Sequence, residues 1–138
     1  MDRLDWNESF RIGVERIDEQ HRKLFALRNQ LLECCCRENS VHAEDFHRIL
    51  SELFEYTRYH FEAEEEFMQA IAYPKLDAHH KCHDQFIDNL VNFSLDAANS
   101  TKTHREVLDF LTVWLINHVL KSDMDIRRYI ESNPGLLS

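Results

Sequence analysis

The sequence of 138 residues contains only two glycines and two prolines. These residue types break helices and build turns, so their scarcity disfavours a turn-rich β fold and favours long helices. Apolar residues make up 43% of the chain and charged residues 30%, an ordinary balance for a globular protein. We therefore predict an all-α fold with enough chain for one domain and a substantial core.

A surplus of basic residues and a long apolar run are also missing. The net charge is -9 with histidine neutral, and an acidic chain repels phosphates, so nucleic acid is not expected as a partner. No apolar run approaches the roughly 18 residues of a membrane span, and the first residues do not resemble a signal peptide. We expect a soluble, cytoplasmic protein without membrane contact.

The cysteines lack the spaced pairs of a disulfide framework. Cys34, Cys35 and Cys36 are adjacent, and Cys82 stands alone. This pattern predicts reduced thiols, in agreement with a cytoplasmic location. An exposed Cys82 would be redox-sensitive, whereas ordinary helix positions are the simpler interpretation of all four residues.

Apolar residues recur at spacings of three and four along four segments, the pattern of helices that bury one face. The clearest example runs from Leu76 to Ala97, and Asp18 and Ser40 are candidate N-caps. Short connections then imply an up-down-up-down antiparallel four-helix bundle with an irregular N-terminal arm and a short C-terminal helix. We predict a single domain over 1–138, with the arm over 1–17, helices over about 19–37, 41–71, 75–97 and 103–121, and a tail over 122–138.

Nine histidines are present, and five of them fall on the predicted inward faces. Two pairs of ligand-type residues are spaced four apart, so the members of each pair point the same way from their helix. Burying such residues is costly unless they are paired, and a metal would satisfy all of them together. The converging residues are His21, His60, Glu64, His79, His83 and His118.

The other histidines and several glutamates lie outside the predicted inward faces of the helices. We expect His42, His47, His80 and His104 to be solvated, and in the run Glu62, Glu64, Glu65 and Glu66 only Glu64 has the phase of a ligand. A single buried histidine is usually just hydrogen-bonded. Two helical pairs together with an inward histidine on each remaining helix favour a metal site instead.

The ligand types narrow the choice of metal. Imidazole suits zinc, copper, iron and nickel, and carboxylate adds a preference for harder ions. No set of thiolates converges, so a structural zinc site or an iron–sulfur cluster is not expected. The converging residues outnumber the ligands that one transition metal ion binds, so we expect two metal ions.

Ordered motifs on all four predicted helices match one family and cover nearly the whole chain. They are Trp6, Gly13 and Ile17-Asp18-Glu19-Gln20-His21; His60-Phe61-Glu62-Ala63-Glu64-Glu65 with Met68; Tyr73-Pro74, His79, His83 and Phe86; and Trp114-Leu115-Ile116-Asn117-His118 with Asp123. Together they resemble the hemerythrin family, and specifically its bacterial single-domain members.

The resemblance implies a non-haem di-iron centre with an oxo or hydroxo bridge. One iron would be bound by His79, His83 and His118, the other by His21 and His60, with Glu64 and Asp123 bridging both. The first iron then has six ligands and the second five, so O2 would bind reversibly at the second, as a hydroperoxide. The apolar O2 pocket would consist of Phe25, Phe61, Trp114, Leu115 and Val119, which exclude water.

Three positions depart from the family pattern or from helical phasing. Ala72 stands where a glycine is usual, which bears on loop geometry. Val119 stands where isoleucine is common, which predicts a slightly roomier pocket. Asp123 follows His118 by five residues, so we expect it where the helix ends or is distorted.

Three classes of function remain for such a chain. It could bind O2 for carriage, storage or delivery; sense O2 or redox state through a protein partner; or act as a di-iron oxidase, peroxidase or nitric-oxide-handling enzyme. No signalling module is visible in the sequence, and five neutral imidazoles supply little charge to stabilise high-valent iron. We therefore predict a reversible O2-binding protein that is not an enzyme.

Overall fold

The computed structural model describes residues 3–35, 42–98 and 104–136, with only the backbone of residues 42–44 and 96–98. Every regular element in these residues is a helix, which confirms the predicted all-α fold. The long helices are α1 (Glu15–Cys35), α2 (His42–Ala70), α3 (Leu76–Ala98) and α4 (His104–Asn117). The shorter elements are η1 (Glu8–Phe10), η2 (His118–Ser122) and α5 (Asp123–Ser132).

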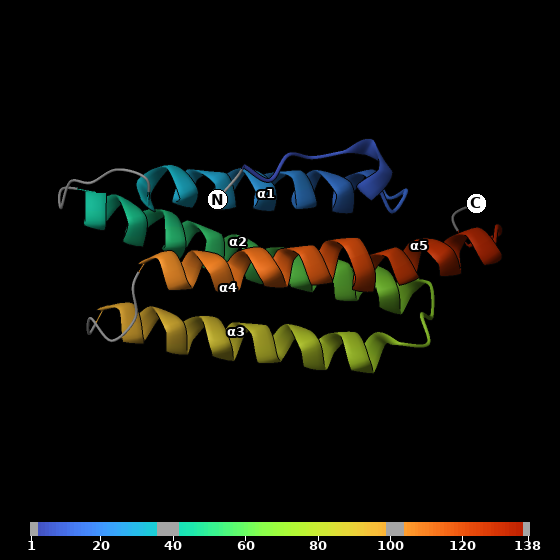
Figure 1. Ribbon diagram of the computed structural model, residues 1–138. Coiled ribbons are helices and arrows are strands. Elements are labelled where there is room, and N and C mark those ends of the chain that lie inside the picture. The colour runs from blue at the N-terminus through green and yellow to red at the C-terminus, as the bar shows by residue number, and fades with distance from the viewer. Residues whose placement is uncertain (1–2, 36–41, 99–103, 137–138) are drawn as a thin grey trace.

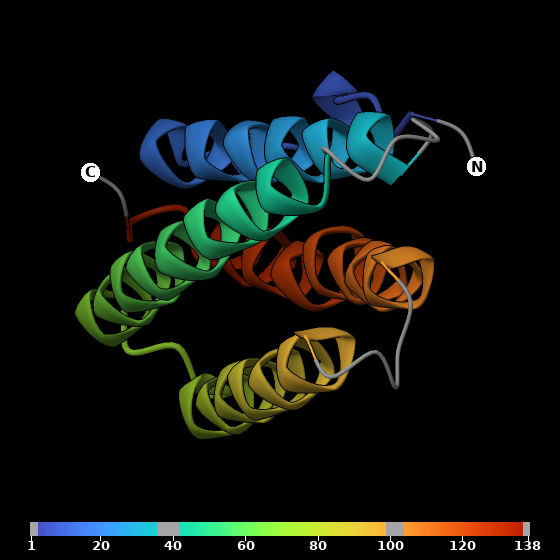
Figure 2. The same cartoon turned by 90° about the vertical axis from the view of Figure 1, so that its left-hand side faces the viewer.

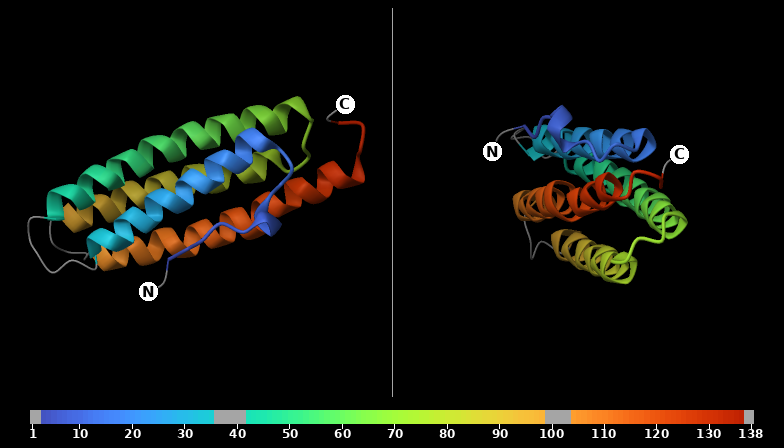
Figure 3. Two further views of the ribbon diagram at one scale, coloured as in Figure 1. Left: turned by 90° about the horizontal axis from the view of Figure 1, so that it is seen from above. Right: turned by 90° about the vertical axis from the view of Figure 1, so that its right-hand side faces the viewer.

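The four long helices run in alternating directions and form an antiparallel bundle (Figure 1). Helices α1 and α3 each pack against both α2 and α4, as the end-on view of Figure 2 also shows. The N-terminal arm runs back alongside α1, and α5 extends the line of α4 (Figure 3). In the described ranges, no helix combines the length and apolarity that crossing a membrane would require.

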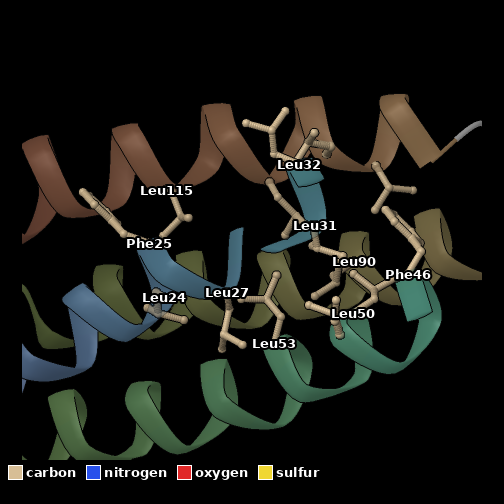
Figure 4. Packing of buried hydrophobic residues seen from close by; sticks show 14 of the residues in the cluster. Leu24, Phe25, Leu27, Leu31, Leu32, Phe46, Leu50, Leu53, Leu90 and Leu115 are labelled. Atoms are coloured by element: carbon tan, nitrogen blue, oxygen red, sulfur yellow. The ribbon is translucent and has the colours of Figure 1, made fainter. Parts of the chain in front are cut away.

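Two apolar clusters fill the bundle, one on each side of a buried polar layer. The larger contains residues of all four long helices, among them Leu31, Phe46 and Leu90 (Figure 4). The smaller contains Ile17, Met68 and other residues near the α2–α3 turn and α5. The histidines and carboxylates of this layer lie where one cluster gives way to the other, along α1, α2 and α3 and where α4 continues through η2 into α5. Apolar packing therefore encloses the polar layer.

The beginning of α1 differs from the prediction. The helix begins at Glu15, not near Glu19, and Asp18 is not its N-cap. The buried Asp18 carboxylate instead accepts hydrogen bonds from the backbone N–H groups of Ile12 at 2.8 Å and Gly13 at 3.2 Å. Gly13 has a φ of 95°, which a residue without a Cβ adopts readily, and the chain turns there from arm to helix. Asp18 therefore fastens the arm. The predicted end of the first helix at Arg37 and the N-cap Ser40 lie outside the described residues.

The end of α4 is distorted. The helix stops at Asn117, short of the predicted Lys121, and continues as the π-helix η2. In η2 the backbone N–H of Asp123 bonds to the carbonyl of His118, five residues earlier. This wider turn brings Asp123 into line with His118, which a regular helix would not do. The short C-terminal helix then follows as α5.

Candidate metal centre

All seven predicted ligands meet inside the bundle. They come from α1 (His21), α2 (His60 and Glu64), α3 (His79 and His83), η2 (His118) and the start of α5 (Asp123). Each is buried, and the side chains of His21, His60, Glu64 and Asp123 are wholly inaccessible to solvent. No helix supplies more than two of them, so the site exists only when the bundle is folded.

The ligand atoms form two overlapping groups, within each of which all atoms lie less than 4.8 Å apart. One group contains His21, His60, Glu64, His118 and Asp123. The other contains Glu64, His79, His83 and His118. Two groups that share ligands fit a pair of neighbouring ions better than a single one.

The two oxygens of Glu64 divide the five imidazoles. Oε1 lies 3.2, 3.3 and 3.5 Å from Nε2 of His79, His83 and His118. Oε2 lies 3.0 Å from Nε2 of His60 and 3.6 Å from Nε2 of His21. The carboxylate therefore has three imidazoles on one side and two on the other, which is the arrangement of a bridging ligand.

Asp123 lies near three of these five histidines and divides them less cleanly. Its Oδ1 lies 2.9 Å from Nε2 of His79, and its Oδ2 lies 2.8 Å from Nε2 of His21. The same Oδ2 is also 3.1 Å from Nε2 of His118. Asp123 thus spans both sides of the centre, with His118 close to the boundary between them.

Unsatisfied polar atoms show that these residues fit metal ions. Seven buried nitrogen and oxygen atoms of the centre make no hydrogen bond in the described structure, although they approach one another closely. They are Nε2 of His21, His60, His83 and His118, both oxygens of Glu64, and Oδ2 of Asp123. Ligands at about 2.0–2.2 Å from a first-row metal ion lie about 3 Å apart, which is close to the spacings here. Bound ions would satisfy every one of these atoms.

Burial and charge act against each other at the centre. Burial lowers the pKa of His60 to about 4. Burial also tends to lower the pKa of His21 and His79, but the carboxylates of Asp123 and Glu64 outweigh it and raise those values to about 9 and about 10. Burial raises the pKa of each carboxyl group, yet the surrounding imidazoles leave that of Asp123 lowered and that of Glu64 well below its usual range. Both carboxyl groups are therefore ionised, as metal ligands must be.

Two supporting residues were missed as functional residues in the sequence. Oε1 of Gln20 lies 2.8 Å from Nδ1 of His60, and Oε2 of Glu65 lies 3.0 Å from Nδ1 of His83. Glu65, which lacks the phase of a ligand in the sequence, is half-buried, and its carboxylate also hydrogen-bonds to His80. Metal-bound histidines usually donate their second N–H to such an acceptor. In the sequence, Gln20 is adjacent to the ligand His21 and Glu65 to the ligand Glu64, and this adjacency was the available signal for both.

Two residues of the predicted O2 pocket stack on histidines of the centre, and the other three belong to the larger apolar cluster. The ring of Phe61 stacks on His83 at 3.8 Å, and that of Trp114 stacks on His118 at 4.4 Å between centroids. Phe25, Leu115 and Val119 are buried in the larger apolar cluster. A cavity of about 220 Å³ reaches Trp114 and His118 from the surface, with the exposed Cys82 in its lining.

The expectation of four solvated histidines is wrong in part. His80 is exposed, although it is bonded to Glu65 and lies 3.1 Å from Asp84. His104 is half-buried because its ring stacks on Phe46 with centroids 4.0 Å apart, and His47 is half-buried against both rings. The side chain of His42 lies outside the described part of the chain.

Comparison with known proteins agrees with this geometry. Residues 12–130 match the model of the hemerythrin HHE cation binding domain. The chain is 34% identical over 131 residues to a bacteriohemerythrin of Clostridium acetobutylicum, covering 91% of this chain and 98% of that one. It is 32% identical over 121 residues to a hemerythrin-like protein of Naegleria gruberi, covering 88% of each. The crystal structure of a wild-type hemerythrin superposes with a TM-score of 0.78 at 25% identity, covering 88% of this chain and 92% of that chain.

The family model spans most of the sequence, and the first relative matches almost end to end. The same residues supply a buried cluster of histidine, glutamate and aspartate suited to metal ions. Non-haem iron and O2 binding follow from the family these comparisons identify. The chain belongs to the hemerythrin family.

Proposed function

We propose that this protein binds O2 reversibly, for carriage, storage or delivery, at a non-haem di-iron centre. The observation that carries the proposal is the division of five imidazoles by the two oxygens of Glu64, three against two. A centre with unequal numbers of protein ligands keeps room for a small ligand on the side that has fewer.

Each ligand residue has a role in this proposal. His79, His83 and His118 would hold one iron, and His21 and His60 the other. Glu64 and Asp123 would bridge the two ions, because each carboxylate faces histidines of both sides. O2 would be taken up on the side of His21 and His60, where the protein provides fewer nitrogen atoms.

The irons, when bound, supply the electrons that hold O2 and take them back on its release. The surrounding residues decide whether that exchange stays reversible. Phe25, Phe61, Leu115 and Val119 are buried, and Trp114 is half-buried over His118. Water and protons promote irreversible oxidation of the iron, and an apolar shell of this kind keeps both from the site.

The test is an optical spectrum of the reduced, iron-loaded protein before O2, after O2 and after O2 removal, with iron counted per chain. We expect two irons and a visible band that appears with O2 and disappears on its removal. The variant Glu64→Gln should hold less iron, whereas Asp84→Asn, at an exposed position outside the centre, should load fully. A band that never reverses, with two irons bound, would favour redox sensing through a partner. Repeated turnover of a substrate by the loaded protein would show an enzyme.

We also propose that the protein works in the cytoplasm. Cys82 is a free thiol, and the cysteines of the sequence lack the spaced pairs of a disulfide framework, which suits a reducing compartment. Fractionation of cells that produce the protein tests this directly. Recovery from an oxidising compartment with modified thiols would contradict it.

A further inference from the structure

Two buried polar atoms beside the metal centre are not explained by metal binding. In the described residues, nine buried side-chain nitrogen and oxygen atoms lack a hydrogen-bond partner, and seven of them face the centre. The other two are Nε1 of Trp6 and Nδ1 of His21. Buried polar groups are rarely left unsatisfied, so these two atoms call for a partner.

Both atoms are hydrogen-bond donors. The indole nitrogen of Trp6 carries a proton and can only donate. Nε2 of His21 faces Glu64 and Asp123 in the centre, and an imidazole that binds metal through Nε2 keeps its proton on Nδ1. Two N–H groups cannot satisfy each other, so both need an acceptor.

Among the described residues, the rings and the guanidinium that pack against Trp6 offer no acceptor. The ring centroids of Trp6 and His21 are 6.4 Å apart. Trp6 otherwise packs against Phe10 and Phe25, with centroids 5.6 and 5.5 Å away, and neither ring has a polar atom. The guanidinium of Arg22 lies 5.3 Å from the Trp6 centroid and has only donors.

We propose that Trp6 and His21 donate to one small hydrogen-bond acceptor, a water molecule or a halide-sized anion, held beneath the N-terminal arm. The inference rests on the proposed function, because Nδ1 of His21 keeps its proton when Nε2 binds metal and the acceptor would act on that metal. The arm is well placed to close such a site. The side chain of Asn29 accepts from the Leu4 N–H at 2.9 Å and donates to the Leu4 carbonyl at 3.0 Å, two residues before Trp6.

The acceptor would act on the metal through His21. A hydrogen bond from Nδ1–H fixes the orientation of the imidazole and makes its Nε2 a stronger donor to the metal. Stronger donation stabilises the oxidised state of the metal and lowers its reduction potential. Trp6 is thus a positioning residue: it holds the shared acceptor, which orients His21 on the side proposed for O2.

The experiment is a high-resolution crystal structure of the iron-loaded protein, native and soaked in bromide, for the wild type and for Trp6→Phe. We expect density within hydrogen-bond distance of both nitrogen atoms, weakened or lost in Trp6→Phe. An anomalous bromide peak there identifies an anion, and its absence identifies water. Two separate acceptors, no density, or unchanged density in the variant would overturn the proposal.

The midpoint potential of the iron-loaded variants tests the role of the acceptor. We expect it to rise in Trp6→Phe relative to the wild type and to Phe10→Leu, which disturbs the packing of Trp6 but keeps its N–H. Equal potentials in the two variants would overturn the tuning role. If density between the two nitrogen atoms is missing while iron content and reversible O2 binding are intact, only this inference is wrong. If the density is present but O2 binding is not reversible, only the proposed function is wrong.

Discussion

The side-chain oxygen of Gln20 lies 2.8 Å from Nδ1 of His60 and joins α1 to α2 beside the metal centre. Both residues are buried, so this contact does not compete with water. When Nε2 of His60 binds metal, Nδ1 carries the proton and donates a hydrogen bond to Oε1 of Gln20. The contact therefore fixes how His60 presents itself to the metal.

Replacing Gln20 tests this orientation. We expect Gln20→Leu to weaken metal binding by about 10- to 100-fold, the usual effect of losing such a partner. Gln20→Glu keeps an acceptor oxygen and should bind close to wild type. The measurement is competition between protein and chelator for Co²⁺, with thermal melts of the metal-free proteins to check folding. Wild-type affinity in a folded Gln20→Leu protein would show that Gln20 does not orient His60.

Leu115 allows packing and protection of the centre to be separated. Leu115 and Leu31 are both buried in the larger cluster, but Leu31 lies ten residues after His21, about 15 Å along α1. Leu115→Ala and Leu31→Ala should each cost about 2–5 kcal/mol of unfolding free energy. Only Leu115→Ala should oxidise faster in air after iron loading, because it opens the apolar shell.

The readouts are denaturant unfolding and the decay of the O2-dependent band. Equal oxidation rates for the two variants, at equal loss of stability, would mean that the shell acts only as core. Faster oxidation in Leu31→Ala would point to general loosening of the bundle.

The spacing of residues along each helix was enough to predict most of this site, because ligands on one helix share a face. The four-residue spacing of His60 with Glu64 predicts a shared face, and α2 presents both inward. Asp123 did not follow from regular helix geometry, since it aligns with His118 only through the π-helix η2. Contacts between helices could not be predicted in this way. Gln20 and His60 are 40 positions apart in the sequence, and the spacing of residues within a helix does not indicate that they hydrogen-bond.

Ala72 occupies a backbone conformation that favours glycine. Its φ is 53°, at the point where α2 ends. The N–H of Tyr73 bonds to the carbonyl of Met68 at 2.9 Å, and that of Ala72 bonds to Gln69 at 3.1 Å. This pair of bonds is a Schellman motif, in which the residue at the position of Ala72 is usually glycine. The departure from the family pattern seen in the sequence is therefore a local backbone strain.

Ala72→Gly should relieve that strain. We expect the unfolding free energy to rise by up to about 1 kcal/mol, because a residue without a Cβ adopts positive φ freely. Ala26→Gly, at an exposed position inside α1, should lower it by about 1 kcal/mol. Chemical denaturation of the metal-free proteins measures both. A loss of stability in Ala72→Gly similar to that in Ala26→Gly would show that flexibility of the unfolded chain outweighs the strain.

Metal loading should release protons near neutral pH. Burial works against the charged forms of His21 and His79, but Asp123 and Glu64 raise their pKa values to about 9 and about 10 in the metal-free protein. Both imidazoles are therefore protonated at about pH 7, and each must lose a proton to bind metal. His60, whose pKa burial lowers to about 4, is already neutral and releases none.

The sign of the pH dependence follows from these values. Because His21 and His79 bind their protons more tightly in the folded state, the stability they give the metal-free protein is complete below the ordinary value of 6.5 and is lost as pH rises through about 9 and about 10. The number of protons released on loading should fall over the same range. Calorimetric titration with Co²⁺ in buffers of different ionisation enthalpy counts them. Loading near neutral pH without proton release would mean that both imidazoles are neutral before metal arrives, and that the two carboxylates do not charge them.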